Sequence, residues 1–225
     1  MFRAERCHCS AGCVVRPLRD GKTDARIKRL RTSHSRRLAG YVPKEYGLDG
    51  AMTPALSIRL AGVDDADAIG RFQTRAWEQS YRGLVPDKYL DGTSWSDRAQ
   101  RWLTRMASGQ RTVWIAFAGS TLLGVASTSI TPPGRPDLPQ LELASLYVES
   151  SWHGRGIAPI LLQRAIGKRP AHLWVFDANT RAQRFYAKHG FITSCERQVD
   201  LGTALVETRW VRPNLSSTTR DHAGA

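Results

Sequence analysis

Apolar and polar residues alternate in a way that predicts an ordered region beginning near Ser57. Residues 57–60 alternate with the period of a β-strand, and Asp64 and Asp65 then stand where a helix could be capped. The apolar positions that follow share one face of that helix, and they are Ile69, Phe72, Ala76 and Trp77. A second helix is expected over residues 95–107, beyond the Gly and Pro of segment 81–86.

The pattern after residue 110 predicts a sheet with two more helices. Strands are expected over residues 112–118, 121–130, 141–148, 172–176, 191–192 and 204–211, and helices over 157–166 and 179–189. The turn Gly119-Ser120 indicates a hairpin, and the helix over 157–166 would connect two strands as a crossover. We therefore expect an α/β (α+β) fold, with one mixed, mostly antiparallel sheet flanked by helices in a single domain.

The positive charge of the chain is concentrated before Met52. The formal charge is +13, and residues 1–51 hold 12 lysines and arginines against five acids. This composition predicts a basic, disordered extension over 1–51, a folded domain over 52–212 and a flexible tail over 213–225. A basic extension can bind nucleic acid, but this one has few aromatic residues to stack on bases, so we expect no nucleic-acid partner. We favour a dispensable extension, with the functional chain starting at Met52.

The cysteines do not indicate a metal site. Cys7, Cys9 and Cys13, with His8, lack the usual Cys-x-x-Cys pair and a second ligand group. Cys195 is expected to be a small buried side chain outside any disulfide framework, which favours a reducing compartment. No apolar run has the length of a membrane span or of a secretory signal. We therefore expect a cytoplasmic protein without a membrane partner, and we leave open whether it forms a homodimer.

The strongest chemical signal is a strand that runs into a glycine-rich turn and then a helix, over residues 141–166. Gly154 and Gly156 allow a tight turn and the close approach of a ligand. The first amides of the helix have no internal acceptor, so a phosphate would be favoured there, and Arg155 adds a positive charge. The turn matches neither the Gly-Lys-Ser/Thr phosphate loop nor Gly-x-Gly-x-x-Gly, and a simple strand–helix connection fits it equally well.

Two blocks of residues resemble the GNAT superfamily of N-acetyltransferases, in its small bacterial type. The segment 153–158, His-Gly-Arg-Gly-Ile-Ala, resembles the family signature Gln/Arg-x-x-Gly-x-Gly/Ala, with His153 in place of Gln or Arg. The family's Asn-x-x-Ala-x-x-Phe-Tyr-x-x-x-Gly-Phe block is matched by Asn179, Ala182, Phe185, Tyr186, Gly190 and Phe191. The segment 77–86 is also similar to the end of the family's first helix. The resemblance covers about residues 57–211 and implies a GNAT fold that uses acetyl-CoA.

The resemblance also implies roles for the matching residues. The turn would hold the diphosphate of acetyl-CoA, and the strand before it would offer backbone groups to the pantetheine and the acetyl carbonyl. The implied cofactor-binding residues are Leu146, Tyr147, Val148, His153, Gly154, Arg155, Gly156, Ile157, Ala158, Asn179 and Tyr186. Tyr186 would also be the general acid that protonates the leaving thiolate, although a core aromatic is the alternative. Trp77 and Tyr81 would line the pocket for the acceptor.

Glu142 is our candidate for the base that takes a proton from the amine. It lies six residues before Val148, so a period of two places both side chains on the same face of the strand. An apolar strand would raise the pKa of its carboxyl group, but a solvent-facing glutamate fits equally well. Asn179 would bind the pantetheine or a water molecule, and it can also cap the helix that follows.

The sequence therefore predicts an N-acetyltransferase that moves the acetyl group of acetyl-CoA to a primary amine of a small molecule or a protein. The alternative is a catalytically inactive CoA-binding module with a regulatory or nucleic-acid-associated role. The basic extension and the departure at His153 favour that alternative, whereas Tyr186 and Asn179 favour the enzyme.

Overall fold

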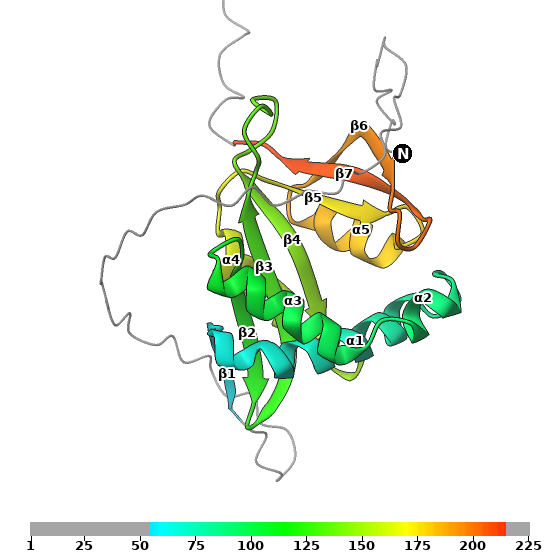
Figure 1. Ribbon diagram of the computed structural model, residues 1–225. Coiled ribbons are helices and arrows are strands. Elements are labelled where there is room, and N and C mark those ends of the chain that lie inside the picture. The colour runs from blue at the N-terminus through cyan, green and yellow to red at the C-terminus, as the bar shows by residue number, and fades with distance from the viewer. Residues whose placement is uncertain (1–54, 215–225) are drawn as a thin grey trace, which may run out of the picture.

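Seven strands form one sheet in residues 55–214, which are the residues that the computed structural model describes (Figure 1). Their spatial order is β1 (Leu56–Leu60), β2 (Thr112–Ala118), β3 (Thr121–Ile130), β4 (Leu141–Val148), β5 (Ala171–Phe176), β7 (Val206–Arg212) and β6 (Ile192–Val199). Only β4 and β5 are parallel, and every other neighbouring pair is antiparallel. The expected mixed sheet is confirmed. The predictions for residues 1–51, including Cys7, Cys9 and Cys13, lie outside the described residues.

The helices cover both faces of this sheet (Figure 1). On one face, α1 (Ala66–Tyr81) and α3 (Trp95–Ala107) enclose a core that contains Phe72, Trp102 and Ile115. On the other face, α4 (Ile157–Ile166) and α5 (Thr180–Lys188) enclose a second core. The short α2 (Asp87–Asp91) and two 3₁₀ turns, η1 (Val63–Asp65) and η2 (Ser150–Trp152), were not expected. The sheet is therefore buried on both sides, which explains its apolar central strands.

Three local expectations were wrong or incomplete. Asp65 is the N-cap residue of α1 as expected, but its side chain makes no capping hydrogen bond there, because its carboxylate accepts the Gly62 N–H and pairs with Arg59. The strand expected over 191–192 instead covers Ile192–Val199. Its length was not predicted because the exposed polar residues of an edge strand weaken the alternation of apolar and polar positions. On that edge Cys195 is exposed and disulfide-bonded rather than buried, so it does not support a reducing compartment.

Within residues 55–214, no helix combines the length and the apolar character needed to cross a membrane.

A β-bulge lies in the middle of β4. Ser127 of β3 pairs with Ser145, but the next residue, Thr128, pairs with Leu143. The strand β4 therefore carries one extra residue, Ala144, and a bulge of this kind shifts the alternation of side chains.

The bulge reverses the expected orientation of Glu142. Leu143, before the bulge, and Leu146 and Val148, after it, all pack toward the core under α4, whereas Tyr147 packs toward α1 and α3. Glu142 therefore lies on the face of Tyr147, opposite to Val148. The same-face prediction was wrong, because a strict period of two does not survive an inserted residue.

The strands β4 and β5 diverge beyond a single point of contact (Figure 1). They pair only at Glu142 and His172, whereas on its other edge β4 stays paired with β3 as far as Val148. Residues 143–148 thus have no strand partner on the β5 side. The Val148 carbonyl oxygen on that edge contacts His153, and the other backbone groups of the edge are open to another partner. This divergence creates the place where a ligand could lie against β4.

Candidate active site

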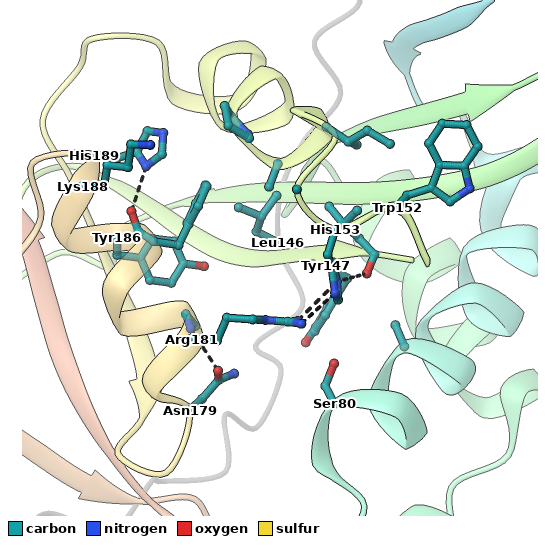
Figure 2. Close-up of a pocket in the computed structure, with 18 of the residues that line it drawn as sticks. Ser80, Leu146, Tyr147, Trp152, His153, Asn179, Arg181, Tyr186, Lys188 and His189 are labelled. Atoms are coloured by element: carbon teal, nitrogen blue, oxygen red, sulfur yellow. Dashed lines mark hydrogen bonds between the residues drawn. The ribbon is translucent and has the colours of Figure 1, made fainter. Parts of the chain in front are cut away.

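A cavity of about 380 Å³ lies beside the unpaired edge of β4 (Figure 2). It is bounded by the C-terminal part of α1, the turn before α4, and α5. The predicted cofactor-binding residues all line it except Arg155, and they are Leu146, Tyr147, Val148, His153, Gly154, Gly156, Ile157, Ala158, Asn179 and Tyr186. Tyr81 lines it as well, but Trp77 and Glu142 are absent from its lining. The fold thus brings together two sequence blocks separated by more than twenty residues.

The turn before α4 has the backbone that its glycines were expected to allow. Gly154 and Gly156 have φ angles of 79° and 82°, in the left-handed region that favours glycine. A Cβ atom added at either position would meet nothing within 4 Å, so the space above the turn is open. The helix α4 begins at Ile157, and its first amides lack internal acceptors, as in any helix. The turn therefore suits a phosphate group.

His153 is held in a neutral form by two partners. Its Nε2 lies 2.9 Å from the Val148 carbonyl oxygen, which only accepts, so Nε2 carries the hydrogen. Its Nδ1 then accepts a hydrogen bond from Nη1 of Arg181 at 2.7 Å. Burial, reinforced by the charge of Arg181, holds the pKa of His153 below its ordinary value. The imidazole therefore connects α5 with the end of β4 without adding a charge (Figure 2).

Tyr186 has the environment of a protonated phenol. It is 8% exposed, and its ring packs edge-on against Phe185 and Phe191. Burial, with smaller contributions from Tyr81 and Tyr147, raises the pKa of its hydroxyl group. Figure 2 shows this hydroxyl group directed from α5 toward the middle of the cavity. The side chain is thus both part of the core and available as a proton donor, and these two interpretations do not compete.

Asn179 connects α5 to α1 at the edge of the cavity. Its Oδ1 accepts the Ala182 N–H at 3.0 Å, which caps α5 as expected, and its Nδ2 donates to the Tyr81 hydroxyl at 3.3 Å. Burial raises the pKa of Tyr81 as well. Trp77 lies behind this wall, where its Nε1 donates to the Tyr147 hydroxyl at 3.0 Å and its ring contacts Tyr81 at 4.8 Å. Trp77 therefore supports the lining and does not face the cavity.

Two charged residues predicted for the site lie elsewhere. The Arg155 guanidinium sits 5.0 Å from the ring centroid of Trp152, outside the cavity lining. Glu142 accepts a hydrogen bond from the Ser129 hydroxyl at 2.9 Å, near the start of β4. Neither residue touches the cavity in this structure.

Sequence reasoning missed several lining residues, and half of those named here lie on α5. Ser80 of α1, Trp152, Arg181, Phe185, Lys188 and His189 all line the cavity. On α5 the positions 182, 185 and 189 repeat at helical spacing from the capping Asn179, so a helical projection from that residue would have found this face. Arg181 could not be found in this way, because its relevance comes from a contact with His153 across the fold.

Comparison with known proteins assigns the family. Residues 73–191 match the family model described as the acetyltransferase (GNAT) family. The chain is also 38% identical over 150 residues to two proteins named as uncharacterized N-acetyltransferases, Rv2669 of Mycobacterium tuberculosis and Mb2688 of Mycobacterium bovis. Those alignments cover 62% of this chain and 91% of each relative. The chain therefore belongs to the GNAT family of acetyltransferases.

Solved structures confirm the fold. The PaiA N-acetyltransferase from Thermoplasma acidophilum, solved with coenzyme A, aligns with a TM-score of 0.54 at 22% identity over 68% of this chain and 98% of its own. YncA from Salmonella typhimurium, a putative acetyltransferase solved with acetyl-CoA, aligns with a TM-score of 0.53 at 20% identity over 75% and 99%. The GNAT-like sheet expected from the sequence is thus confirmed.

Proposed function

We propose that this protein is an N-acetyltransferase that transfers the acetyl group of acetyl-CoA to a primary amine of a small molecule or a protein. The observation that carries the proposal is the cavity in which the unpaired edge of β4, the open glycine turn and the Tyr186 hydroxyl meet. Family membership supports the acetyl-transfer chemistry. The PaiA and YncA structures, solved with coenzyme A and with acetyl-CoA respectively, support the choice of carrier.

The residues present fit such a carrier. The turn at Gly154 and Gly156, with the start of α4, offers amide donors and a positive helix end to a diphosphate. The backbone of Leu146–Val148 on the β5 side offers the donors and acceptors that an amide-containing arm needs. Acetyl-CoA supplies a thioester, which is an activated acyl group.

Different groups of this chain would assist the separate steps of acyl transfer. The amine nitrogen forms a bond to the acetyl carbon, and a backbone N–H near Val148 donates to the oxygen that becomes negative. The C–S bond breaks as the intermediate collapses, and the Tyr186 hydroxyl donates its proton to the leaving sulfur. Glu142 lies on the α1 face of the sheet together with Tyr147, which is the side that carries Trp77. As a base it would receive the amine proton from that side, through water.

The proposal includes a cytoplasmic location, because acetyl-CoA is a metabolite of the cell interior. The argument for this location does not use the cysteines of the chain. It also does not depend on whether the chain is a monomer or a homodimer, since every residue used belongs to one chain.

The test is thiol release from acetyl-CoA in the presence of a panel of primary amines. The Tyr186→Phe variant keeps the buried ring but loses the proton donor, so its kcat should fall about 10²-fold with CoA affinity nearly unchanged. Equal turnover by wild type and variant at saturating substrates would remove Tyr186 as the acid. Tight CoA binding without thiol release for any amine would favour the inactive CoA-binding module.

A further inference from the structure

The position at which this chain departs from the family signature is next to an arginine from another helix. His153 stands where the signature has Gln or Arg, and a neutral imidazole cannot replace a guanidinium as a donor of several hydrogen bonds. The guanidinium of Arg181, 28 residues later in the sequence, lies against this imidazole (Figure 2). A positive charge is therefore present at this corner of the cavity, and it comes from α5.

The contact orients Arg181 and leaves donors available. Nη1 donates to Nδ1 of His153 at 2.7 Å, whereas Nη2, at 3.2 Å from the protonated Nε2, has no acceptor there. Among residues 55–214 the ion pairs found do not include Arg181. Because Arg181 lines the cavity, its remaining N–H groups can meet an anion that enters it.

The other cation expected at the turn is oriented differently. Arg155 lies over the ring of Trp152 and does not line the cavity. Lys188 does line it, but that residue is at the opposite end of α5, nearly two helical turns from Arg181. Arg181 is the lining cation that touches the turn itself.

We propose that Arg181 binds the diphosphate of acetyl-CoA, in place of the Gln or Arg of the signature, and that His153 is the positioning residue that orients it. This inference rests on the proposed function, because it assumes that the cavity binds the carrier. It assigns the anion contact to α5, an element outside the signature, and it explains how a histidine at position 153 is compatible with cofactor binding.

Calorimetry with CoA and with pantetheine, which lacks the phosphates, tests the proposal without measuring activity. Arg181→Ala should weaken the binding of CoA about tenfold or more and leave pantetheine binding unchanged. Dephospho-CoA, which keeps the diphosphate but lacks the 3′-phosphate, should lose affinity as CoA does. Raising the salt concentration should weaken CoA binding to wild type more than to the variant. The matched control is Arg184→Ala, since Arg184 is an exposed arginine of the same helix outside the cavity lining.

Variants of His153 test its positioning role. His153→Gln provides an amide oxygen that can accept from Arg181, so CoA affinity should be kept, whereas His153→Leu should lower it. In the Arg181→Ala background, His153→Leu should have little further effect, because a positioning residue acts through its partner.

Three outcomes would overturn the inference. Equal CoA affinity of wild type and Arg181→Ala would show that Arg181 does not bind the diphosphate. Tighter binding by the variant would show that the Arg181–His153 contact closes the cavity instead. An equal loss for CoA and pantetheine would place the contact elsewhere on the carrier. If wild type itself bound no CoA, the proposed function would fail rather than this assignment alone.

Discussion

Replacing Glu207 with glutamine tests whether the partly buried carboxyl group at the start of β7 destabilises the fold when it is charged. Glu207 pairs with Phe176 in the sheet, and its Oε1 accepts from Gln198 Nε2 at 2.6 Å. Burial, opposed by Gln198 but assisted by Asp200, raises the pKa of Glu207 from 4.5 to about 7. Glutamine keeps the shape and the acceptor but carries no charge.

The size and sign of the effect follow from the two pKa values. The folded chain binds the proton of Glu207 more tightly than the unfolded chain, so this group contributes most to stability below pH 4.5 and its contribution is lost as the pH rises through 7. Each pKa unit corresponds to about 1.4 kcal/mol, so the full effect is about 3 kcal/mol. Roughly 2.5 kcal/mol of it falls between pH 5 and pH 8.

Urea unfolding at pH 5 and pH 8 measures this difference. Relative to wild type, Glu207→Gln should gain about 2.5 kcal/mol of unfolding free energy between the two pH values. The control is Glu78→Gln, an exposed glutamate of α1, which should follow wild type at both pH values. If Glu207→Gln and wild type showed the same pH dependence, the carboxyl group would carry no buried-charge cost and the reasoning would be refuted.

Two further predictions concern the site. Gly156→Trp should abolish CoA binding measured by calorimetry, because the indole would fill the open space above the turn. Gly134→Trp is the matched control, since Gly134 also has a positive φ and open space around it but lies in the loop between β3 and β4. Normal CoA affinity for Gly156→Trp would contradict the diphosphate site. Glu142→Gln keeps an acceptor for Ser129 but removes a base, so kcat in the thiol-release assay should fall about 10²-fold with CoA affinity unchanged. Full turnover by this variant would assign proton removal to another group or to water.

Much of the fold around the site could be predicted because the sequence signals for its strands and helices are local. The bounds expected for the strands over 112–118, 121–130 and 141–148 and for the helices over 95–107 and 157–166 agree with the structure. Short-range alternation, helical period and glycine turns determine such elements. The short helix α2 and the length of β6 could not be predicted in this way. A five-residue helix has too few turns to show a helical period, and the edge strand β6 carries polar residues on both faces, which hides the alternation.

The sequence by itself determined the glycine turn before α4, the capping by Asn179 and the place of Tyr186 on α5, because each depends on neighbours within a few positions. Only the tertiary structure decided which way Glu142 faces, since the bulge at Ala144 arises from the pairing of β4 with β3. Packing likewise decided that Arg181 meets His153, and that Trp77 supports Tyr147 behind the lining. Contacts between distant segments depend on how β4 and β5 diverge and on how α5 packs against the sheet, and no local sequence pattern encodes them.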